Sequence, residues 1–323
     1  MLRNQHRTLF ASLSLLSLIG RSFAFTPTKL KFGLRTAHSE TKMNSETHYD
    51  YLVIGGGSGG VASARRAASY GAKVCLVEKA ALGGTCVNVG CVPKKIMFNA
   101  ATVSEIIHDA KQFGFHVDGF RFEWNELKVA RDAYIARLNG IYGRLLTGSK
   151  VDYVVGAASF NGPKSVVVEG KTYTAENILI AVGGKPAMPN IPGVEHCISS
   201  DGFFALDTQP KRVAVVGGGY IGVELAGVFH GLGTETHLFT RAARPLKGFD
   251  TMIVDTLLSE MKKQKLTYHP NCSPESVKKG SDGTLSFIDN NGLQHGPFDQ
   301  VCALLRFTLC FIILPHCSTV LIE

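Results

Sequence analysis

The sequence lacks several features that would assign it to a simple class of protein. Its apolar run at residues 9–19 is shorter than the roughly 20 residues that a membrane-spanning helix needs. Charged residues make up only 19% of the chain and apolar residues 45%, which excludes a disordered polyelectrolyte and permits large packed cores. The 35 glycines follow no collagen-like period and so indicate turns and close backbone contacts. At 323 residues, the chain has room for two or three domains.

The body of the chain also lacks an excess of basic charge. Residues 1–48 hold seven Lys and Arg side chains against two acids, which accounts for five of the eight net positive charges. The rest of the chain, from 49 to 323, carries only the other three, so it shows no electrostatic footprint of a nucleic-acid-binding protein. We therefore predict no nucleic-acid partner. The short apolar runs likewise predict no stable membrane anchor.

The segment 1–48 has the pattern of a targeting presequence. No acid precedes Glu40, and basic residues come before the apolar run. The triplet Ser22-Phe23-Ala24 then offers the small residues of a signal-peptidase site, and an acid-free, hydroxylated stretch typical of a transit peptide follows. This order is similar to the bipartite plastid presequences of algae with complex plastids, so we predict plastid import. Mitochondrial import, or a cytosolic form that starts at Met43, is the alternative.

The next segment predicts a dinucleotide-binding βαβ unit. Residues 51–54 are an apolar run typical of a buried parallel strand, and a G-x-G-x-x-G turn leads from them into an alanine-rich helix. A second strand at 73–78 ends on the acid Glu78. In such a unit the first glycine makes the turn, the second lets a pyrophosphate approach, and the third allows close packing of helix on strand. The terminal acid is expected to bind a ribose. These glycines are Gly55, Gly57 and Gly60.

Two cysteines five residues apart follow in a segment that enters a helix. Five residues of regular helix rise about 7.5 Å, so a disulfide between Cys86 and Cys91 needs a distorted turn, which Gly90 can supply. A strained, reducible disulfide beside a nucleotide site is typical of a catalytic one. The helix N-terminus and Lys94 are expected to lower the thiol pKa values. Two buried thiols are the alternative. No metal site is expected, since neither Cys-x-x-Cys nor clustered His occurs nearby. The other six cysteines show no pairing pattern, and we interpret most of them as small core hydrophobes; they are Cys75, Cys197, Cys272, Cys302, Cys310 and Cys317.

A second G-x-G-x-x-G turn follows an apolar strand pattern at 211–216 and precedes a predicted helix at 220–232. Its glycines are Gly217, Gly219 and Gly222. The position that corresponds to Glu78 in spacing holds Thr240 rather than an acid, and the cations Arg241, Arg244 and Lys247 come next. The missing acid and the added cations favour the 2′-phosphate of NADP over the free ribose of NAD. An ordinary solvated loop is the alternative interpretation of the cations.

The cysteine segment at 83–95 resembles that of the pyridine nucleotide–disulfide oxidoreductases, and within this family the chain is most similar to the glutathione reductases. Stretches at 131–142, 178–184 and 200–206 support the resemblance, which runs from about residue 50 to about residue 305. It implies an α/β fold with two Rossmann-like dinucleotide-binding domains of three-layer ββα type. The expected boundaries are a presequence at 1–48, an FAD-binding domain at 49–190 and an NADPH-binding domain at 191–305.

The resemblance also implies roles for single residues. Electrons would pass from NADPH through FAD to a Cys86–Cys91 disulfide that reduces glutathione disulfide, with Cys86 attacking the substrate and Cys91 resolving the mixed disulfide. Lys94 would pair with Glu224 near the flavin, and Tyr220 would gate the nicotinamide site. The implied cofactor contacts are Gly55, Gly57, Ser58, Gly59, Gly60, Glu78, Thr85, Cys86, Lys94, Ala158, Gly183, Gly217, Gly219, Ile221, Gly222, Glu224, Arg241 and Lys247. The implied substrate contacts are Ser58, Ala62, Arg65 and Tyr142.

Three departures from the family pattern accompany the resemblance. Lys247 stands where the family has an arginine and lacks the bidentate fork, and Gly222 stands where glutathione reductases commonly have alanine. Residues 306–323 match nothing in the family, whose members continue with a second FAD segment and a dimerisation domain. We therefore expect an incomplete chain, and a homodimer only of the full-length family member. Trypanothione, thioredoxin or dihydrolipoamide types of reductase are alternatives, as is a non-catalytic nucleotide-binding relic.

Overall fold

The computed structural model describes residues 47–304 and 306–309. The chain divides into two units, residues 1–45 and 46–323, and only the second is described here. The predicted presequence lies outside the described residues except for its last two positions. The same holds for most of the predicted non-family tail, including Cys310 and Cys317. No helix within the described ranges is both long enough and apolar enough to cross a membrane.

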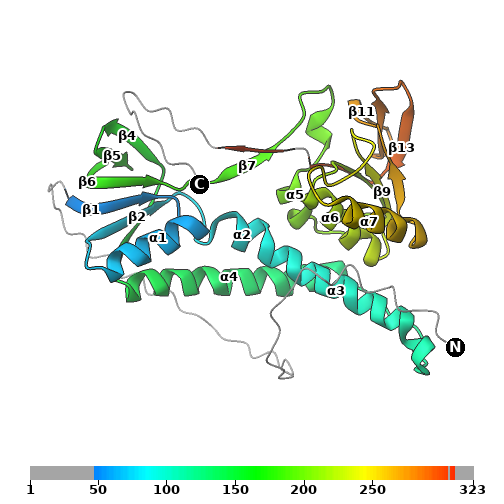
Figure 1. Cartoon of the computed structure of the whole chain (residues 1–323), viewed down its shortest axis with the longest axis horizontal. Coiled ribbons are helices and arrows are strands. Elements are labelled where there is room, and N and C mark those ends of the chain that lie inside the picture. Colours follow the sequence, from blue (N-terminus) through cyan, green and yellow to red (C-terminus); the bar gives the residue numbers. More distant parts are fainter. Residues whose placement is uncertain (1–46, 305, 310–323) are drawn as a thin grey trace. The chain divides into compact units, whose positions relative to one another are not determined.

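The first sheet combines parallel strands with an antiparallel hairpin (Figure 1). Its strands are β1 (Thr47–Ile54), β2 (Val74–Glu78), β3 (Val151–Val155), β4 (Ala158–Gly162), β5 (Ser165–Val168) and β6 (Lys171–Ile180). Their order is β3-β2-β1-β6-β5-β4, in which the first four are parallel and the last three are joined by antiparallel pairing. The predicted strand at 51–54 is therefore the second half of β1, and the strand expected at 73–78 is present as β2.

Helices fill the connections on one side of this sheet. They are α1 (Ser58–Ser69), α2 (Gly84–Val89), α3 (Cys91–Asp109), the 3₁₀ turn η1 (Ala110–Phe113) and α4 (Trp124–Gly148). In Figure 1, α1 and α4 run along the same face of β1 and β2. Val61 and Leu146 from these helices pack there against Val53 and Leu76 of the strands. The layer is apolar because alternate strand residues point to this face.

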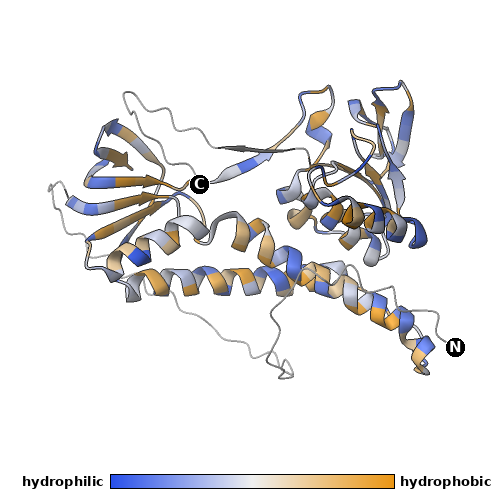
Figure 2. Cartoon of the chain, in the orientation of Figure 1, coloured by the Kyte–Doolittle hydropathy of each residue, from blue (hydrophilic) through white to orange (hydrophobic). Residues whose placement is uncertain are grey.

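The opposite face of the first sheet is covered by its own hairpin. Leu52 and Cys75 point to this side and pack against Val166 and Val168 of β5. Both faces of β2 are therefore buried, and this strand carries the hydrophobic colours in Figure 2. A strand buried on both faces is a continuous apolar run in the sequence, which is why β2 is recognisable there.

The second sheet is wholly parallel. Its strands are β8 (Arg212–Val216), β9 (Glu235–Phe239), β10 (Thr267–His269) and β14 (Gln300–Ala303), in the order β10-β9-β8-β14, which repeats the β3-β2-β1-β6 part of the first sheet. Three antiparallel strands form a further layer: β11 (Pro274–Lys279), β12 (Leu285–Asp289) and β13 (Gln294–Phe298). The remaining elements are β7 (Gly184–Ala187), η2 (Val194–His196), α5 (Ser200–Ala205), α6 (Tyr220–Gly231), α7 (Thr251–Lys263) and β15 (Arg306–Leu309), which pairs with β7.

The two faces of the second sheet bury different partners. Val213 and Val215 face the helices and pack with Phe229 of α6 in one cluster. Ala214 and Phe239 face the other way, toward the antiparallel layer. Helix, parallel sheet and antiparallel sheet thus make three layers, as Figure 1 shows. The α/β fold with two Rossmann-like domains is confirmed.

Side chains connect the long helices to the elements of the second sheet. Trp124, the first residue of α4, stacks on Phe229 of α6 with ring centroids 6.0 Å apart, and its indole nitrogen donates to the Leu206 carbonyl at 2.8 Å. Arg131 of α4 is buried and donates to the Phe204 carbonyl at 2.6 Å. These contacts hold α4 against α5 and α6, beside the segment that carries the two cysteines.

Candidate active site and its nucleotide-binding turns

The first glycine-rich turn is closed so tightly that side chains do not fit at two of its positions. Gly55 has φ +115°, and a Cβ there would lie 2.1 Å from the Ala181 carbonyl oxygen. A Cβ on Gly60 would lie 1.9 Å from the Gly55 carbonyl oxygen. By contrast, a Cβ built on Gly59 would meet no described atom within 4 Å beyond its neighbours in the chain. The first and third glycines of the motif therefore allow close approach of the backbone, and a Cβ on the second, Gly57, would lie 3.7 Å from the Gly84 Cα.

Glu78 closes the same turn from the end of β2. Its Oε2 accepts a hydrogen bond from the Gly56 amide at 2.6 Å, and its Oε1 accepts one from the Ala80 amide at 2.7 Å. Two backbone donors therefore fix the carboxylate beside the turn. The remaining acceptor positions of the carboxylate suit a ribose hydroxyl.

The N-terminus of α1 opens into a cavity of about 1110 Å³. Gly57 caps the helix without a side-chain hydrogen bond, so the first amides of α1 lack a capping side chain. Gly84 crosses close to it: a Cβ on Gly84 would lie 2.7 Å from the Gly57 Cα. The cavity is lined by many of the expected residues: Gly57, Ser58, Gly59, Glu78, Thr85, Cys86, Cys91, Lys94, Gly183, Tyr220, Ile221 and Glu224. A helix N-terminus with open amides is suited to a phosphate group.

The two cysteines lie on either side of a break between helices. Residue Cys86 is in α2, Cys91 begins α3, and Gly90 joins them with φ −146° and ψ −119°. A Cβ on Gly90 would lie 2.7 Å from the Thr85 carbonyl oxygen. The distorted turn expected at Gly90 is therefore present, and it is what brings the cysteines together. Both are free thiols in the structure.

The expected lowering of the thiol pKa is wrong for Cys86. Burial, together with a side-chain hydrogen bond with Cys91, raises the pKa of this thiol to about 11. A hydrogen bond with Ser58 acts in the opposite direction but does not offset these effects. Desolvation of the thiolate thus raises the pKa of Cys86 by more than the helix N-terminus suggested by the sequence lowers it.

An asparagine pair that the sequence analysis did not single out secures the cysteine helix. The Asn139 side chain on α4 donates to the Leu82 carbonyl at 2.7 Å and to Asn88 Oδ1 at 3.0 Å. Asn88 in turn donates to the Gly84 carbonyl at 2.9 Å and lines the cavity. In the sequence, the position of Asn88 between the two cysteines is the feature that could have indicated this role. The pair connects α2 to α4 through hydrogen bonds. Hydrogen bonds have a preferred direction, which an apolar contact lacks.

Residues beside the second sheet reach the same cavity. Lys94 Nζ donates to Glu224 Oε1 at 2.9 Å, which is the pairing that the family resemblance implies. Tyr220, the first residue of α6, is 58% exposed and lines the cavity together with Ile221. Phe204 and Leu225 also line it, although no sequence motif marks them. The contact of α3 with α6 is therefore what completes this site.

The second glycine-rich turn repeats the geometry of the first. Gly217 has φ +141°, and a Cβ there would lie 2.2 Å from the Leu304 carbonyl oxygen. A Cβ on Gly222 would lie 2.0 Å from the Gly217 carbonyl oxygen, so an alanine at this position would require this backbone to move. Where Glu78 contacts the first turn, Thr240 contacts the second, with its Cγ2 3.0 Å from a Cβ built on Gly218. The side chain at this position thus offers a hydroxyl in place of a carboxylate.

A basic loop folds back over this second turn. The Leu246 amide donates to the Gly218 carbonyl at 2.6 Å, which holds the neighbouring Lys247 close to the turn. Arg244 is engaged elsewhere, with Asp255 and the Thr251 carbonyl. Within residues 47–304, neither Arg241 nor Lys247 takes part in an ion pair, and both are exposed. Two of the three predicted cations are therefore available to an anion.

The chain matches a known protein family over most of its length. Residues 49–305 match the family model described as "Pyridine nucleotide-disulphide oxidoreductase". The chain belongs to this family. It is also similar to proteins named "Glutathione reductase" from two yeasts. Identity to that of Yarrowia lipolytica is 54% over 257 residues, which is 75% of this chain and 55% of the relative. Identity to that of Schizosaccharomyces pombe is 51% over 254 residues, which is 76% of this chain and 55% of the relative. The chain spans about half the length of these relatives.

The pyridine nucleotide–disulphide oxidoreductases use FAD, and glutathione reductases use NADPH as well. The residues of this chain fit both groups. A glycine cradle that a Cβ would fill, open helix amides and a fixed carboxylate suit FAD at the first turn. The second turn has the same cradle with two available cations in place of the acid, which suits NADPH.

Several residues implied by the resemblance lie outside the cavity of this family member. Ala158 begins β4 and packs against the core; it is Gly156 whose amide reaches the Glu78 carbonyl, at 2.9 Å. Arg65 donates from Nε to Ser149 Oγ at 3.0 Å. Tyr142 packs half-buried against the helix-side core, and Ala62 is exposed on α1. Ala62, Arg65 and Tyr142 are therefore not among the residues that line the described cavity.

Proposed function

We propose that this chain carries the nucleotide-binding and thiol-bearing parts of an NADPH-dependent glutathione-disulfide reductase. The observation that supports this most is the cavity that contains Cys86, Cys91 and the Lys94–Glu224 pair beside the first glycine-rich turn. We further propose that residues 49–190 form the FAD-binding domain and residues 191–305 the NADPH-binding domain. A homodimer is proposed for the full-length family member.

The cysteine pair performs the disulfide exchange in this proposal. The Cys86 thiol gives up its proton and its sulfur attacks one sulfur of glutathione disulfide. The bond between the two glutathione sulfurs breaks, a mixed disulfide forms, and the released glutathione thiolate takes up a proton. Cys91 then attacks the Cys86 sulfur, which releases the second glutathione and leaves a Cys86–Cys91 disulfide. FAD, when bound, supplies the redox chemistry that returns this disulfide to two thiols at the expense of NADPH.

The surrounding side chains stabilise charge at the cavity and bind the nucleotide. Lys94 is held by Glu224 at 2.9 Å, so its ammonium stays fixed at the cavity wall, where it can stabilise negative charge. Tyr220 is exposed at the same cavity, as a side chain that moves aside for a nicotinamide would be. Arg241 and Lys247 bind the 2′-phosphate and select NADPH over NADH.

The decisive experiment combines cofactor binding with disulfide reduction in the full chain. Purified chain loaded with FAD is mixed with NADPH without oxygen, and bleaching of the flavin absorbance is expected. Oxidised glutathione is then added and free thiols are measured. The Cys86→Ser variant is the matched control: it is expected to bind FAD and to form no glutathione thiol. A chain that binds no FAD, or a Cys86→Ser variant that still reduces glutathione disulfide, would contradict the proposal.

We also propose that residues 1–48 direct the protein into a plastid. The support is the order of their features: a basic start, a short apolar run, a small-residue cleavage site and an acid-free hydroxylated stretch. Mitochondrial import of the same segment is the competing destination, and a start at Met43 would remove most of the segment.

A further inference from the structure

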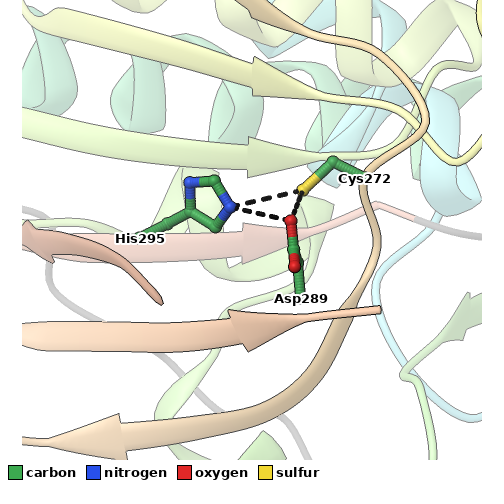
Figure 3. A group of neighbouring side chains, drawn as sticks. All are labelled: Cys272, Asp289 and His295. Carbon is green, nitrogen blue, oxygen red and sulfur yellow. Dashed lines mark hydrogen bonds and ion pairs between the residues drawn. The ribbon is translucent and has the colours of Figure 1, made fainter. Parts of the chain in front are cut away.

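Three side chains of different chemistry converge in the antiparallel layer beside the second sheet, away from the cavity. Cys272 follows β10, Asp289 ends β12, and His295 lies in β13 (Figure 3). Their ligand atoms all lie within 4.8 Å of one another. The Cys272 Sγ is 3.2 Å from Asp289 Oδ2 and 3.7 Å from His295 Nε2, and the latter two atoms are 2.9 Å apart. Cys272 is therefore not the purely apolar core residue that the sequence predicts.

The three side chains are arranged like ligands around a metal ion and not like the members of a proton relay. In a relay, a histidine uses one ring nitrogen for the nucleophile and the other for the carboxylate. Here the same nitrogen, Nε2 of His295, faces both the thiol and the carboxylate, as Figure 3 shows. Zinc bonds of about 2.0–2.3 Å at tetrahedral angles place ligand atoms roughly 3.4–3.6 Å apart. The observed triangle reaches that size if Oδ2 moves outward by about half an ångström.

The surroundings hold each side chain in this orientation without an ion. Asp289 Oδ1 accepts hydrogen bonds from the Asn291 and Leu293 amides, both at 2.9 Å, which leaves Oδ2 directed at the other two ligands. The His295 ring stacks on Phe287 with centroids 5.0 Å apart. Supporting contacts behind the ligands are typical of metal sites because they fix ligand direction. The His295 side chain is 18% exposed, which gives an ion access from solvent.

We propose that Cys272, Asp289 and His295 bind a zinc ion, with water in the fourth position. A thiolate, an imidazole and a carboxylate form a mixed S, N, O set that suits zinc, whereas calcium and magnesium prefer oxygen ligands throughout. Binding displaces the thiol proton of Cys272 to solvent. The ligands lie too far apart in the chain to match a short zinc motif, so only the folded sheet assembles the site.

The ion would connect the antiparallel layer to the loop that carries Arg241. The Cys272 amide donates to the Thr240 carbonyl at 2.9 Å, and the Asn271 amide donates to the Ala242 carbonyl at 3.3 Å. These two carbonyls flank Arg241 in the chain. Zinc therefore stabilises the packing of β12 and β13 against the parallel sheet and anchors this loop, and the unfolding temperature is expected to rise when zinc binds.

The test measures zinc in the full chain with Cys86→Ser and Cys91→Ser already in place, because that thiol pair can also bind zinc. After equilibration with zinc and dialysis, elemental analysis is expected to give one zinc per chain. Cobalt bound in place of zinc is expected to show a thiolate charge-transfer band and tetrahedral ligand-field bands. Adding Cys272→Ser or His295→Gln is expected to remove the zinc and both spectral signals. Cys197→Ser is the matched control, since Cys197 packs against the same core and does not belong to the ligand group.

Two outcomes would overturn the proposal. One is a Cys86→Ser, Cys91→Ser chain that retains no zinc and shows no cobalt–thiolate band, which would make the three residues a hydrogen-bonded cluster alone. The other is zinc that remains in full after both Cys272→Ser and His295→Gln. Circular dichroism of each variant without metal checks the fold. If Cys272→Ser does not fold, His295→Gln and the cobalt spectrum of the unaltered site still decide the question.

Discussion

At the scale of single residues, one position separates the two nucleotide sites. Glu78 and Thr240 occupy equivalent places, against Gly56 and Gly218, each of which follows the first glycine of its motif. The carboxylate of Glu78 is fixed by two amides, whereas Thr240 donates its hydroxyl to the Ala242 carbonyl at 2.7 Å. The first site therefore presents a negative charge, and the second presents the cations that follow. This difference could be read from the sequence because the two residues have the same spacing from the first glycine of their motif.

The cations of the second site give the prediction at this scale. We expect Arg241→Leu to weaken NADPH binding roughly ten- to a hundredfold, which is the range for losing a hydrogen bond to a charged group, and to leave NADH binding nearly unchanged. Arg244→Leu is the matched control, because Arg244 is already engaged by Asp255. Titration of both nucleotides against each variant checks this. Equal losses for NADPH and NADH in Arg241→Leu, or an equal NADPH loss in Arg244→Leu, would rule out the assigned role.

At the scale of elements, the junction between α2 and α3 decides the chemistry of the thiols. Sequence spacing predicted the distortion at Gly90, because a regular helix cannot bring Cys86 and Cys91 together. It could not predict the direction of the Cys86 pKa shift. That direction depends on how much of the thiol is buried and on the hydrogen bond from its neighbour, and both are set by packing of the two helices.

The geometry of this junction predicts an unusual pH dependence for the alkylation of Cys86. Because the pKa of Cys86 is raised to about 11, alkylation of this thiol is expected to be slow at neutral pH and to keep rising with pH beyond the ordinary cysteine range. Cys91→Ala removes the neighbouring thiol, so the pKa of Cys86 should fall. Alkylation at neutral pH should then accelerate about threefold for each unit of that fall, because the larger thiolate fraction is partly offset by lower nucleophilicity. Mass spectrometry of Cys86 after timed alkylation measures both. A reduced parent chain whose Cys86 titrates below the ordinary value would show that the helix N-terminus dominates instead.

At the scale of the whole molecule, residues of α6 reach the cavity beside the first glycine-rich turn because α3 meets α6. Lys94 and Glu224 come from distant parts of the sequence, as do Trp124 and Phe229. The repeat of strand order in the two sheets follows from the two βαβ patterns. Contact between the two domains follows from the apolar and hydrogen-bonding side chains on the long helices, which have no local motif.

The proposed targeting leader, residues 1–48, supplies the prediction at this scale. Residues 1–48 fused to a fluorescent protein are expected to carry it into plastids when expressed in an alga with complex plastids, because the segment combines a signal-peptide pattern with a transit-peptide pattern. Fluorescence microscopy with plastid and mitochondrial markers measures the destination. A fusion lacking residues 1–24 is the control and is expected to stay outside the plastid. Mitochondrial fluorescence of the complete leader would favour the competing destination.

The sequence by itself determined the two nucleotide-binding turns, the acid that distinguishes them and the cysteine pair. These features are local: glycine is needed where a Cβ would overlap backbone at Gly55 or Gly60, and buried parallel strands are apolar throughout. Only the tertiary structure decided the raised pKa of Cys86, the Asn88–Asn139 bond and the convergence of Cys272, Asp289 and His295. Each of these depends on burial or on contact between elements distant in the chain. Burial and contacts of this kind form only when the layers pack against one another. No short stretch of sequence therefore encodes them.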